Sequence, residues 1–281
     1  MPAGKLSTHS TFSRLTASCY LGSTEGKFLG DPAFDELMAE LDNRETVVFV
    51  HPNLHATSEN IGINVPGFLI EFLCDTTCAA LNLIVSGTTE KFPRIRWIFA
   101  HAGGFLPYVS WRVSLANTMP EIAQRAPQGM LTYIKRFYFE TALSPSPPVM
   151  AALRELVESS HILFGSDFPF APAVLSAVQV KTLDESPLWD DETKYGINRG
   201  HALSLFPSYR SKDEKVAPMP IYGRQSVGTR VRRALAKPVV SFAERVRNKQ
   251  HRPVELLHFV ADWGEIATSN SEGCDVESPG Q

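Results

Sequence analysis

Four short apolar segments of the sequence are each followed by a side chain that can bind a metal ion or move a proton: His51, His101, Glu140 and Asp167. Imidazole and carboxylate groups suit zinc or a similar divalent ion, and both can act as general acids or bases. A lone histidine after a strand is more often a hydrogen-bonded structural residue. Ligand-type side chains at successive strand ends favour a shared site instead.

The apolar segments are rich in β-branched and aromatic residues and do not alternate with polar ones, which is typical of strands buried on both faces of a parallel sheet. The carboxyl ends of such strands meet at one mouth in α/β barrels and open α/β sheets. We therefore expect the four side chains to lie at one rim. The segments are "VVFVH" (residues 47–51), "RWIFAH" (96–101), "RFYFETAL" (136–143) and "ILFGSD" (162–167).

Helical patterns alternate with these strands. Asp31 before Pro32 predicts an N-cap with proline at the first helical position, in a helix that leads into the first strand. The apolar segment from Pro66 to about Thr89 predicts one long buried helix. Helices are also expected after His101, in "SPPVMAALRELVESS" and in "DDETKYGINRGHALSLFP". This alternation predicts βα units and a parallel sheet.

Glycines follow the second histidine directly. Gly103 and Gly104 permit a tight turn from strand to helix. Their backbone N–H groups could bind an anion such as a substrate carboxylate at the rim, or the glycines could serve turn geometry alone. Pro52 and Pro169 are expected to rigidify the turns after His51 and Asp167.

The composition excludes several classes of partner. The chain has 281 residues, of which 43% are hydrophobic and 20% charged, and a net charge of -3 gives no reason to expect nucleic acid or an anionic membrane. No apolar run reaches the roughly 18 to 20 residues of a membrane span. We interpret the four cysteines as reduced packing residues of an intracellular, cytoplasmic protein.

The composition also divides the chain into three parts. Residues 1–18 are polar and Ser/Thr-rich, and we expect them to be disordered or atypical. Residues 19–208 carry the βα pattern. Residues 209–281 are expected to form a largely disordered basic tail, because residues 210–252 hold twelve Lys or Arg against three acidic residues.

Several motifs resemble the amidohydrolase-2 family of metal-dependent, non-oxidative decarboxylases, in particular its 6-methylsalicylate decarboxylase branch. They are "VVFVHP", "DTTCAALNLIVSGTTEKFPRIRWIFAHAGGFLPY" and "ILFGSDFPF", and the resemblance covers roughly residues 19 to 208. It implies a (β/α)8 TIM barrel of the metal-dependent hydrolase type, holding a divalent metal ion. Zinc is the expected ion, with manganese as the alternative.

The resemblance also implies roles for individual residues. His51 matches the metal ligand that ends strand 5, and Asp167 matches the ligand that ends strand 8. His101 matches the strand 6 histidine that helps to move protons, and Asp167 could share that role. Glu140, Gly103 and Gly104 are the candidates for substrate binding. Asp75 lies in a motif that the family carries, and no role is assigned to it.

One departure from the family pattern is severe. The chain contains no H-x-H pair, which supplies the strand 1 ligands in the family, and fifty residues precede His51. Four βα units would need about half of a roughly 250-residue barrel. We therefore expect an incomplete barrel of about strands 4 to 8, with "TASCYLG" as a remnant of strand 4. Pairing with a second copy or a complementing chain is the alternative that would restore closure.

The activity that the resemblance implies is loss of CO2 from a small aromatic carboxylic acid such as 6-methylsalicylate. Two alternatives stay open from the sequence. The same metal barrel could activate water against a lactone or an amide. The chain could also be an inactive remnant or a binding subunit whose basic tail contacts a partner.

Overall fold

The computed structural model describes residues 17–54, 65–212 and 214. The chain divides into two compact units, residues 1–226 and 227–281, and every described residue belongs to the first. The segment 1–16 and most of the predicted basic tail therefore lie outside the described residues, and the predicted disorder of both stays a prediction.

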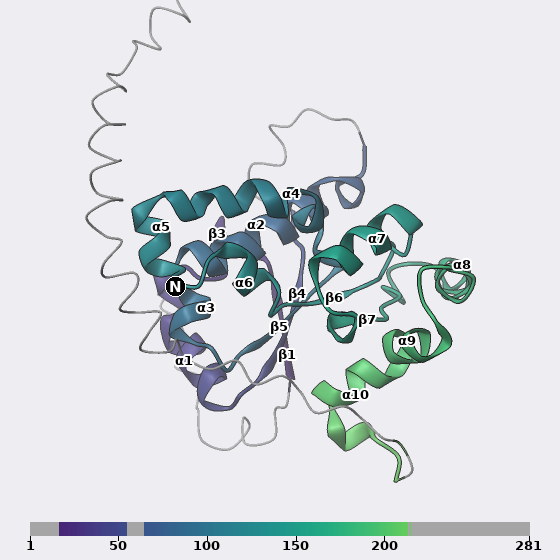
Figure 1. Ribbon diagram of the computed structural model, residues 1–281. Coiled ribbons are helices and arrows are strands. Elements are labelled where there is room, and N and C mark those ends of the chain that lie inside the picture. Colours follow the sequence, from purple (N-terminus) through teal and green to yellow (C-terminus); the bar gives the residue numbers. More distant parts are fainter. Residues whose placement is uncertain (1–16, 55–64, 213, 215–281) are drawn as a thin grey trace, which may run out of the picture. The chain divides into compact units, whose positions relative to one another are not determined.

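Five parallel strands form the main sheet (Figure 1). Each strand pairs with the next one along the chain, in the order β1-β4-β5-β6-β7. A two-stranded antiparallel ribbon, β2 (Ser23–Thr24) with β3 (Lys27–Phe28), follows the first strand. The five strands are β1 (Ala17–Leu21), β4 (Val47–His51), β5 (Arg96–Phe99), β6 (Tyr138–Glu140) and β7 (Ile162–Leu163).

The strand order identifies the architecture. A doubly wound sheet reverses its strand order at a switch point, whereas a barrel adds each strand beside the previous one. The order here shows no reversal, so the sheet is part of a (β/α)8 barrel and corresponds to the predicted strands 4 to 8. Within the segment "TASCYLG", residues Ala17–Leu21 form strand β1, which pairs with β4.

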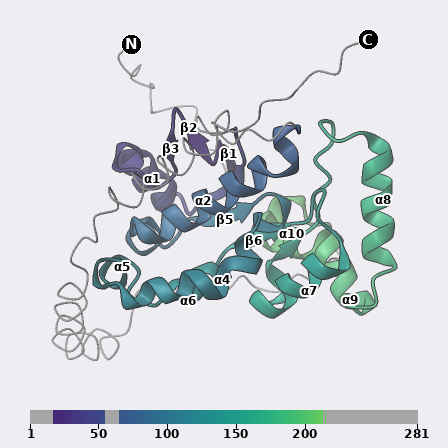
Figure 2. The ribbon, with the colours of Figure 1, turned by 90° about the horizontal axis from the view of Figure 1, so that it is seen from above.

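Most of the helices cover one side of this sheet (Figure 1), whereas the last one packs on the other side. Figure 2 shows α8 at the edge of the described unit, beside α7 and α9. A π-helical turn, Gly196–Gly200, joins α9 to α10. The helices are α1 (Asp35–Asn43), α2 (Glu71–Val85), α3 (Thr88–Lys91), α4 (Leu106–Ser114), α5 (Pro120–Arg125), α6 (Met130–Ile134), α7 (Pro147–Leu156), α8 (Ala173–Asp184), α9 (Asp191–Tyr195) and α10 (His201–Leu205).

Alternate residues of each strand face opposite sides of the sheet. The side that faces the helices carries the large core, where Val50 and Phe99 are fully buried among side chains of α1, α2, α4, α6 and α7. The opposite, inner side holds a smaller cluster that packs against Leu205 of α10, formed by Val47, Ile98, Tyr138 and Leu163. In β4 the side chains of Val47, Phe49 and His51 therefore face the inner side, whereas those of Val48 and Val50 face the helices.

Several local predictions are confirmed. Asp31 caps the 3-10 turn Pro32–Phe34 before α1, and its Oδ1 accepts the N–H of Ala33 at 2.8 Å. The predicted proline-initiated helix is α7, which begins at Pro147. Within the described residues, no helix combines the length and the apolar character that a membrane crossing requires.

Three local predictions need correction. The helix expected from Pro66 to Thr89 is interrupted, because Gly87 takes the left-handed conformation (φ 85°) and separates α2 from α3. The last two strands are shorter than their apolar runs, since β6 and β7 end at the paired residues Glu140 and Leu163. Helix α8 was not expected at all, since its sequence carries no clear amphipathic pattern.

Candidate metal centre

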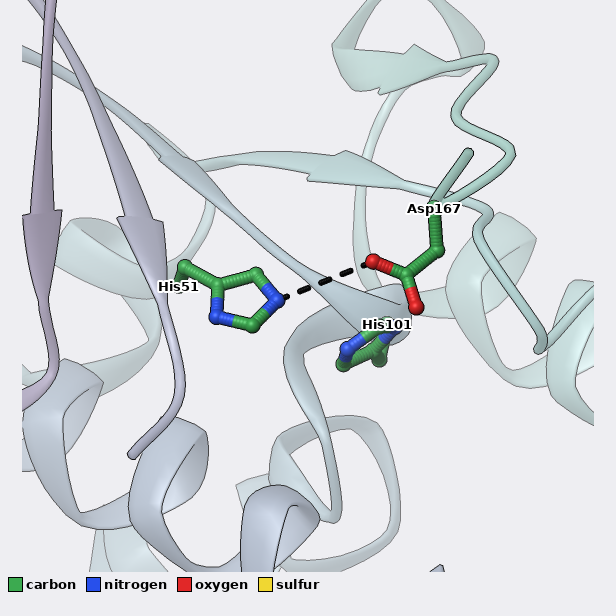
Figure 3. A group of neighbouring side chains, drawn as sticks. All are labelled: His51, His101 and Asp167. Carbon is green, nitrogen blue, oxygen red and sulfur yellow. Dashed lines mark ion pairs between the residues drawn. The ribbon is translucent and has the colours of Figure 1, made fainter. Parts of the chain in front are cut away.

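Three of the predicted side chains meet at the carboxyl ends of the strands (Figure 3). One nitrogen or oxygen atom from each of His51, His101 and Asp167 lies within 4.8 Å of the other two. His51 Nε2 is 3.8 Å from Asp167 Oδ1, and the two imidazole rings lie edge to face with centroids 5.6 Å apart. Residues from three separate βα units therefore share one small polar site.

The strand ends explain this convergence. His51 is the last residue of β4 and occupies an inner-face position, while His101 and Asp167 lie in the loops that follow β5 and β7. His101 and Asp167 have positive φ angles of 55° and 60°. This conformation costs a non-glycine residue roughly 1–2 kcal/mol. Both loops thus turn sharply at the residue that carries the functional side chain.

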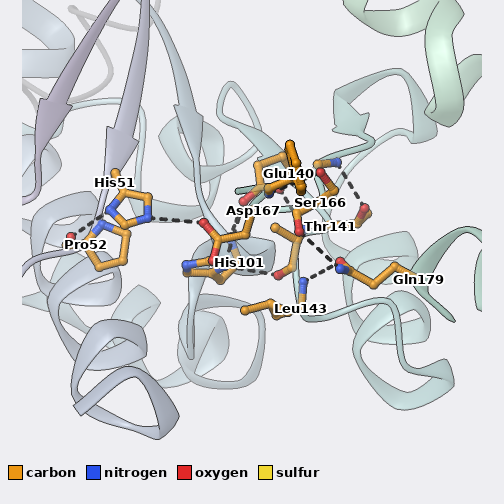
Figure 4. Close-up of polar contacts among 12 residues, drawn as sticks. His51, Pro52, His101, Glu140, Thr141, Leu143, Ser166, Asp167 and Gln179 are labelled. Atoms are coloured by element: carbon orange, nitrogen blue, oxygen red, sulfur yellow. Dashed lines mark hydrogen bonds and ion pairs between the residues drawn. The ribbon is translucent and has the colours of Figure 1, made fainter. Parts of the chain in front are cut away.

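Backbone carbonyls fix the protonation pattern of both histidines (Figure 4). His51 Nδ1 lies 2.9 Å from the carbonyl oxygen of Pro52, and His101 Nδ1 lies 3.1 Å from that of Ala142. A carbonyl oxygen can only accept, so each Nδ1 carries the proton and donates it. In the neutral rings Nε2 then keeps a lone pair, as in histidines that bind a metal ion.

Glu140 is the last residue of β6, and it is 5% exposed. Its two oxygens accept the backbone N–H groups of His101, at 2.6 Å, and of Ala142, at 2.7 Å. Burial raises the pKa of Glu140 to about 7, although both backbone bonds act to lower it, and the nearby Asp167 carboxylate raises it further. Both oxygens are occupied by the protein, so the arrangement favours a structural role over the predicted substrate contact.

The backbone N–H groups of the glycine turn after His101 already have hydrogen-bond partners within the protein. The N–H groups of Gly103 and Gly104 donate to the carbonyls of Ala100 and His101, both at 3.0 Å, and so serve the turn itself. A Cβ atom on Gly103 would meet the Phe139 ring at 2.6 Å, and one on Gly104 would collide with the carbonyl oxygen of Leu73. These contacts favour the turn-geometry interpretation.

Two buried polar residues that support the rim had no predicted role. Asp75 of α2 is 2% exposed and accepts bonds from Ser23 Oγ at 2.5 Å and from the backbone N–H of Asn53 at 2.9 Å. It therefore fastens the loop that follows His51. Gln179 of α8 bonds to the loops that follow β6 and β7. An acid inside an apolar helix was a sequence signal for Asp75, whereas Gln179 gave none.

The donor set fits a divalent metal ion. The site offers two imidazole nitrogens with free lone pairs and one carboxylate. Histidine nitrogen and carboxylate oxygen are both common ligands of zinc in proteins. The carbonyl partners of both Nδ1 atoms provide the hydrogen bonds that usually orient metal-binding histidines. The sequence-based assignment of His51 and Asp167 as ligands, with His101 as an acid or base, stays a prediction that this geometry supports.

Over about two thirds of its length the chain is similar to known proteins. The chain is 36% identical to a 6-methylsalicylic acid decarboxylase of Penicillium expansum over 183 residues, which cover 64% of this chain and 56% of that protein. The match thus spans little more than half the length of the relative.

Solved structures share the fold. One described as an amidohydrolase II superposes with a TM-score of 0.63 at 28% identity, over 68% of this chain and 61% of that one. A 5-carboxyvanillate decarboxylase from Novosphingobium aromaticivorans, complexed with manganese and a nitrobenzoic acid, superposes with a TM-score of 0.60 at 18% identity, over 67% and 55%.

The family assignment follows from the length of the match together with the fold. Residues 20–207 match the amidohydrolase family Amidohydro_2, and this range contains all five parallel strands except the first residues of β1, as well as His51, His101 and Asp167. The chain belongs to the amidohydrolase family.

Proposed function

We propose that this chain supplies part of the active site of a metal-dependent, non-oxidative decarboxylase. The observation that carries the proposal is the meeting of His51, His101 and Asp167 at the rim of an amidohydrolase-family barrel. The proposed substrate is a small aromatic carboxylic acid of the 6-methylsalicylate kind, a choice supported by the name of the Penicillium relative.

His51 and Asp167 are the proposed ligands of the ion, through Nε2 and a carboxylate oxygen. The proposed ion is zinc, with manganese as the alternative because a similar structure holds it. When bound, the ion would act as a Lewis acid that anchors and polarises substrate oxygens. Asp167 adds negative charge beside His51, which favours a cation at this position.

His101 is the proposed proton donor. Its Nδ1–H stays on the carbonyl of Ala142, so the proton to be delivered is the one on Nε2 of the imidazolium form. Transfer of this proton to the ring carbon that bears the carboxylate makes the carbon tetrahedral. The bond to the carboxylate then breaks, CO2 leaves, and the electron pair of that bond restores the aromatic ring. His101 regains its proton from solvent.

Further ligands would strengthen the site. A catalytic zinc site usually has three protein ligands, and fewer would bind the ion more weakly. We propose that additional ligands come from polypeptide outside the described residues, whether in this chain, a second copy or a complementing chain. The match to only 56% of the Penicillium relative supports this part of the proposal.

Carbon and hydrogen labelling tests the proposed reaction. 6-Methylsalicylate carrying ¹³C in its carboxylate would be incubated with the chain in D2O, with zinc or manganese added. We expect metal-dependent release of ¹³CO2 and one deuterium at the vacated ring carbon. His101→Gln should lower the rate by about 10²–10⁴-fold, the usual contribution of a general acid.

His161→Gln is the matched control, because His161 is a buried histidine bonded to the carbonyl of Phe137, outside the rim. It should retain the wild-type rate. Equal ¹³CO2 release by wild type and His101→Gln would contradict the role of His101. Hydrolysis of a lactone or amide without any ¹³CO2 release would contradict the decarboxylase proposal and favour the hydrolase alternative.

A further inference from the structure

Gln179 is a buried amide on an otherwise apolar and exposed part of helix α8. Gln179 is only 4% exposed, whereas its neighbours Val178 and Val180 are 54% and 39% exposed. Burial of an amide is costly unless hydrogen bonds replace those to water. The position of Gln179 is therefore best explained by the groups that it binds.

Both ends of this amide are hydrogen-bonded to loops of the rim (Figure 4). Its Oε1 accepts the backbone N–H of Leu143 at 2.6 Å, in the loop after β6. Its Nε2 donates to the backbone carbonyl of Ser166 at 3.2 Å, in the loop after β7. One side chain thus joins two neighbouring βα loops.

The first bond reaches His101 through a single peptide unit. The Leu143 N–H that binds Gln179 and the Ala142 carbonyl that binds His101 Nδ1 belong to the same planar group. In a trans peptide the N–H and C=O point in opposite directions, so fixing the N–H also aims the carbonyl. Leu143 has a positive φ of 56°, an unfavourable conformation that this bond helps to maintain.

The second bond reaches Asp167 in the same way. The carbonyl of Ser166 and the N–H of Asp167 share one peptide plane, and the φ angle of Asp167 is measured from that plane. With this φ at 60°, the direction of the carboxylate depends on where the plane is held. Gln179 Nε2 holds it through the Ser166 carbonyl.

We propose that Gln179 is a positioning residue that fixes the Nδ1–H tautomer of His101 and the direction of Asp167 by orienting the peptide units 142–143 and 166–167. This inference deepens the proposed function, on which its metal-binding consequence rests. With Nδ1–H held on Ala142, the lone pair of His101 Nε2 faces the site. Without Gln179, the Ala142 peptide can rotate and His101 can adopt either tautomer.

The test compares Gln179→Met, which has a similar shape but lacks the amide, with Tyr133→Phe. The control also removes a part-buried hydrogen bond, between Tyr133 and Glu90 at 2.7 Å, but in the helix layer away from the rim. The tautomer of His101 would be read from imidazole ¹⁵N shifts in the metal-free protein at about pH 8, where a free imidazole is neutral. Signals would be assigned with His101→Gln.

We expect the Nδ1–H tautomer in wild type and Tyr133→Phe, and a mixture of tautomers in Gln179→Met. Zinc affinity should fall about 10-fold in Gln179→Met, within the range seen when partners of metal ligands are removed, and should not change in Tyr133→Phe. A common loss of thermal stability in the two variants would show that the difference in tautomer is not a general effect of destabilisation.

An unchanged His101 tautomer in Gln179→Met would overturn the proposal. If that variant does not fold, amide hydrogen exchange in the wild type decides: Leu143 must be protected, and exchange at the rate of an unstructured peptide would refute the bond. Failure of the wild type to bind zinc would contradict the proposed function alone, because the tautomer is measured without metal.

Discussion

The apolar core between the sheet and the helices and the rim at the carboxyl ends of the strands are stabilised by different interactions. The helix-facing side of the sheet is a core of fully buried apolar side chains such as Val50, Phe99 and Phe139. The rim at the carboxyl ends is polar, and its residues His101 and Asp167 hold unfavourable backbone angles through a few directional hydrogen bonds. The core spreads its energy over many contacts, whereas the rim depends on individual bonds.

The largest expected effect lies in the core. Phe139→Ala should lower the free energy of unfolding by about 3–5 kcal/mol, because it removes a fully buried ring and leaves a cavity between the sheet and the helices. Urea denaturation of wild type and variant would measure this change. A loss of less than about 1 kcal/mol would mean that the helix layer does not pack on the sheet as described.

Two glycine-to-alanine substitutions separate the cost of backbone strain from the cost of a close contact. Gly104 (φ 64°) and Gly26 (φ 74°) both have positive φ, but a Cβ atom would collide with Leu73 only at Gly104, and nothing lies within 4 Å of it at Gly26. Gly26→Ala should cost about 1–2 kcal/mol from backbone strain alone. Gly104→Ala should cost more, and equal losses in thermal or urea unfolding would contradict the contact.

A smaller effect is expected from pH, through buried histidines away from the rim. Burial lowers the pKa values of His161 and His201 below their ordinary value of 6.5. Below pH 6.5 the unfolded chain binds more protons at these two histidines than the folded chain does. The stability that depends on their being neutral is therefore fully present above pH 6.5, and it is lost as the pH falls from there through their lower pKa values in the folded chain.

The variant His161→Gln isolates one of these groups. The difference in melting temperature between about pH 7.5 and pH 5.5, on either side of the unperturbed histidine pKa, should be smaller in the variant than in wild type. An identical difference would show that His161 titrates alike in the folded and unfolded chains. Residues that face His161 include Glu158, which favours its charged form, and His201, which opposes it.

The same contrast explains how far the sequence was informative. Apolar runs predicted the strands, and the residues that end them predicted the rim, because a strand that is buried on both faces leaves a continuous apolar run in the sequence. Gly87 broke a predicted helix because a left-handed residue inside an apolar segment leaves that pattern unchanged. Helix α8 was missed because apolar residues such as Val174 and Val178 lie exposed on it.

The bonds that hold the rim were harder to predict. The sequence predicted a shared rim for His51 and Asp167, but the distance between the two side chains depends on the loop conformation that holds Asp167 at a positive φ, which local patterns do not encode. Gln179 binds backbone groups, and every residue offers a backbone carbonyl and nearly every residue an N–H, so no partner residue type marks it in the sequence. The anion-binding hypothesis for Gly103 and Gly104 could be weighed only once the acceptors of their N–H groups were known.

Zinc titration of the metal-free chain tests the central claim most directly, by competition with a chromophoric chelator, for wild type, His51→Ala, Asp167→Ala and the control His161→Gln. We predict saturable binding of one ion per chain in wild type and control, and loss of that binding in both rim variants. Melting temperatures of the rim variants should confirm that they are folded. Binding that survives both rim substitutions, or no saturable binding in folded wild type, would contradict a metal centre formed by His51 and Asp167.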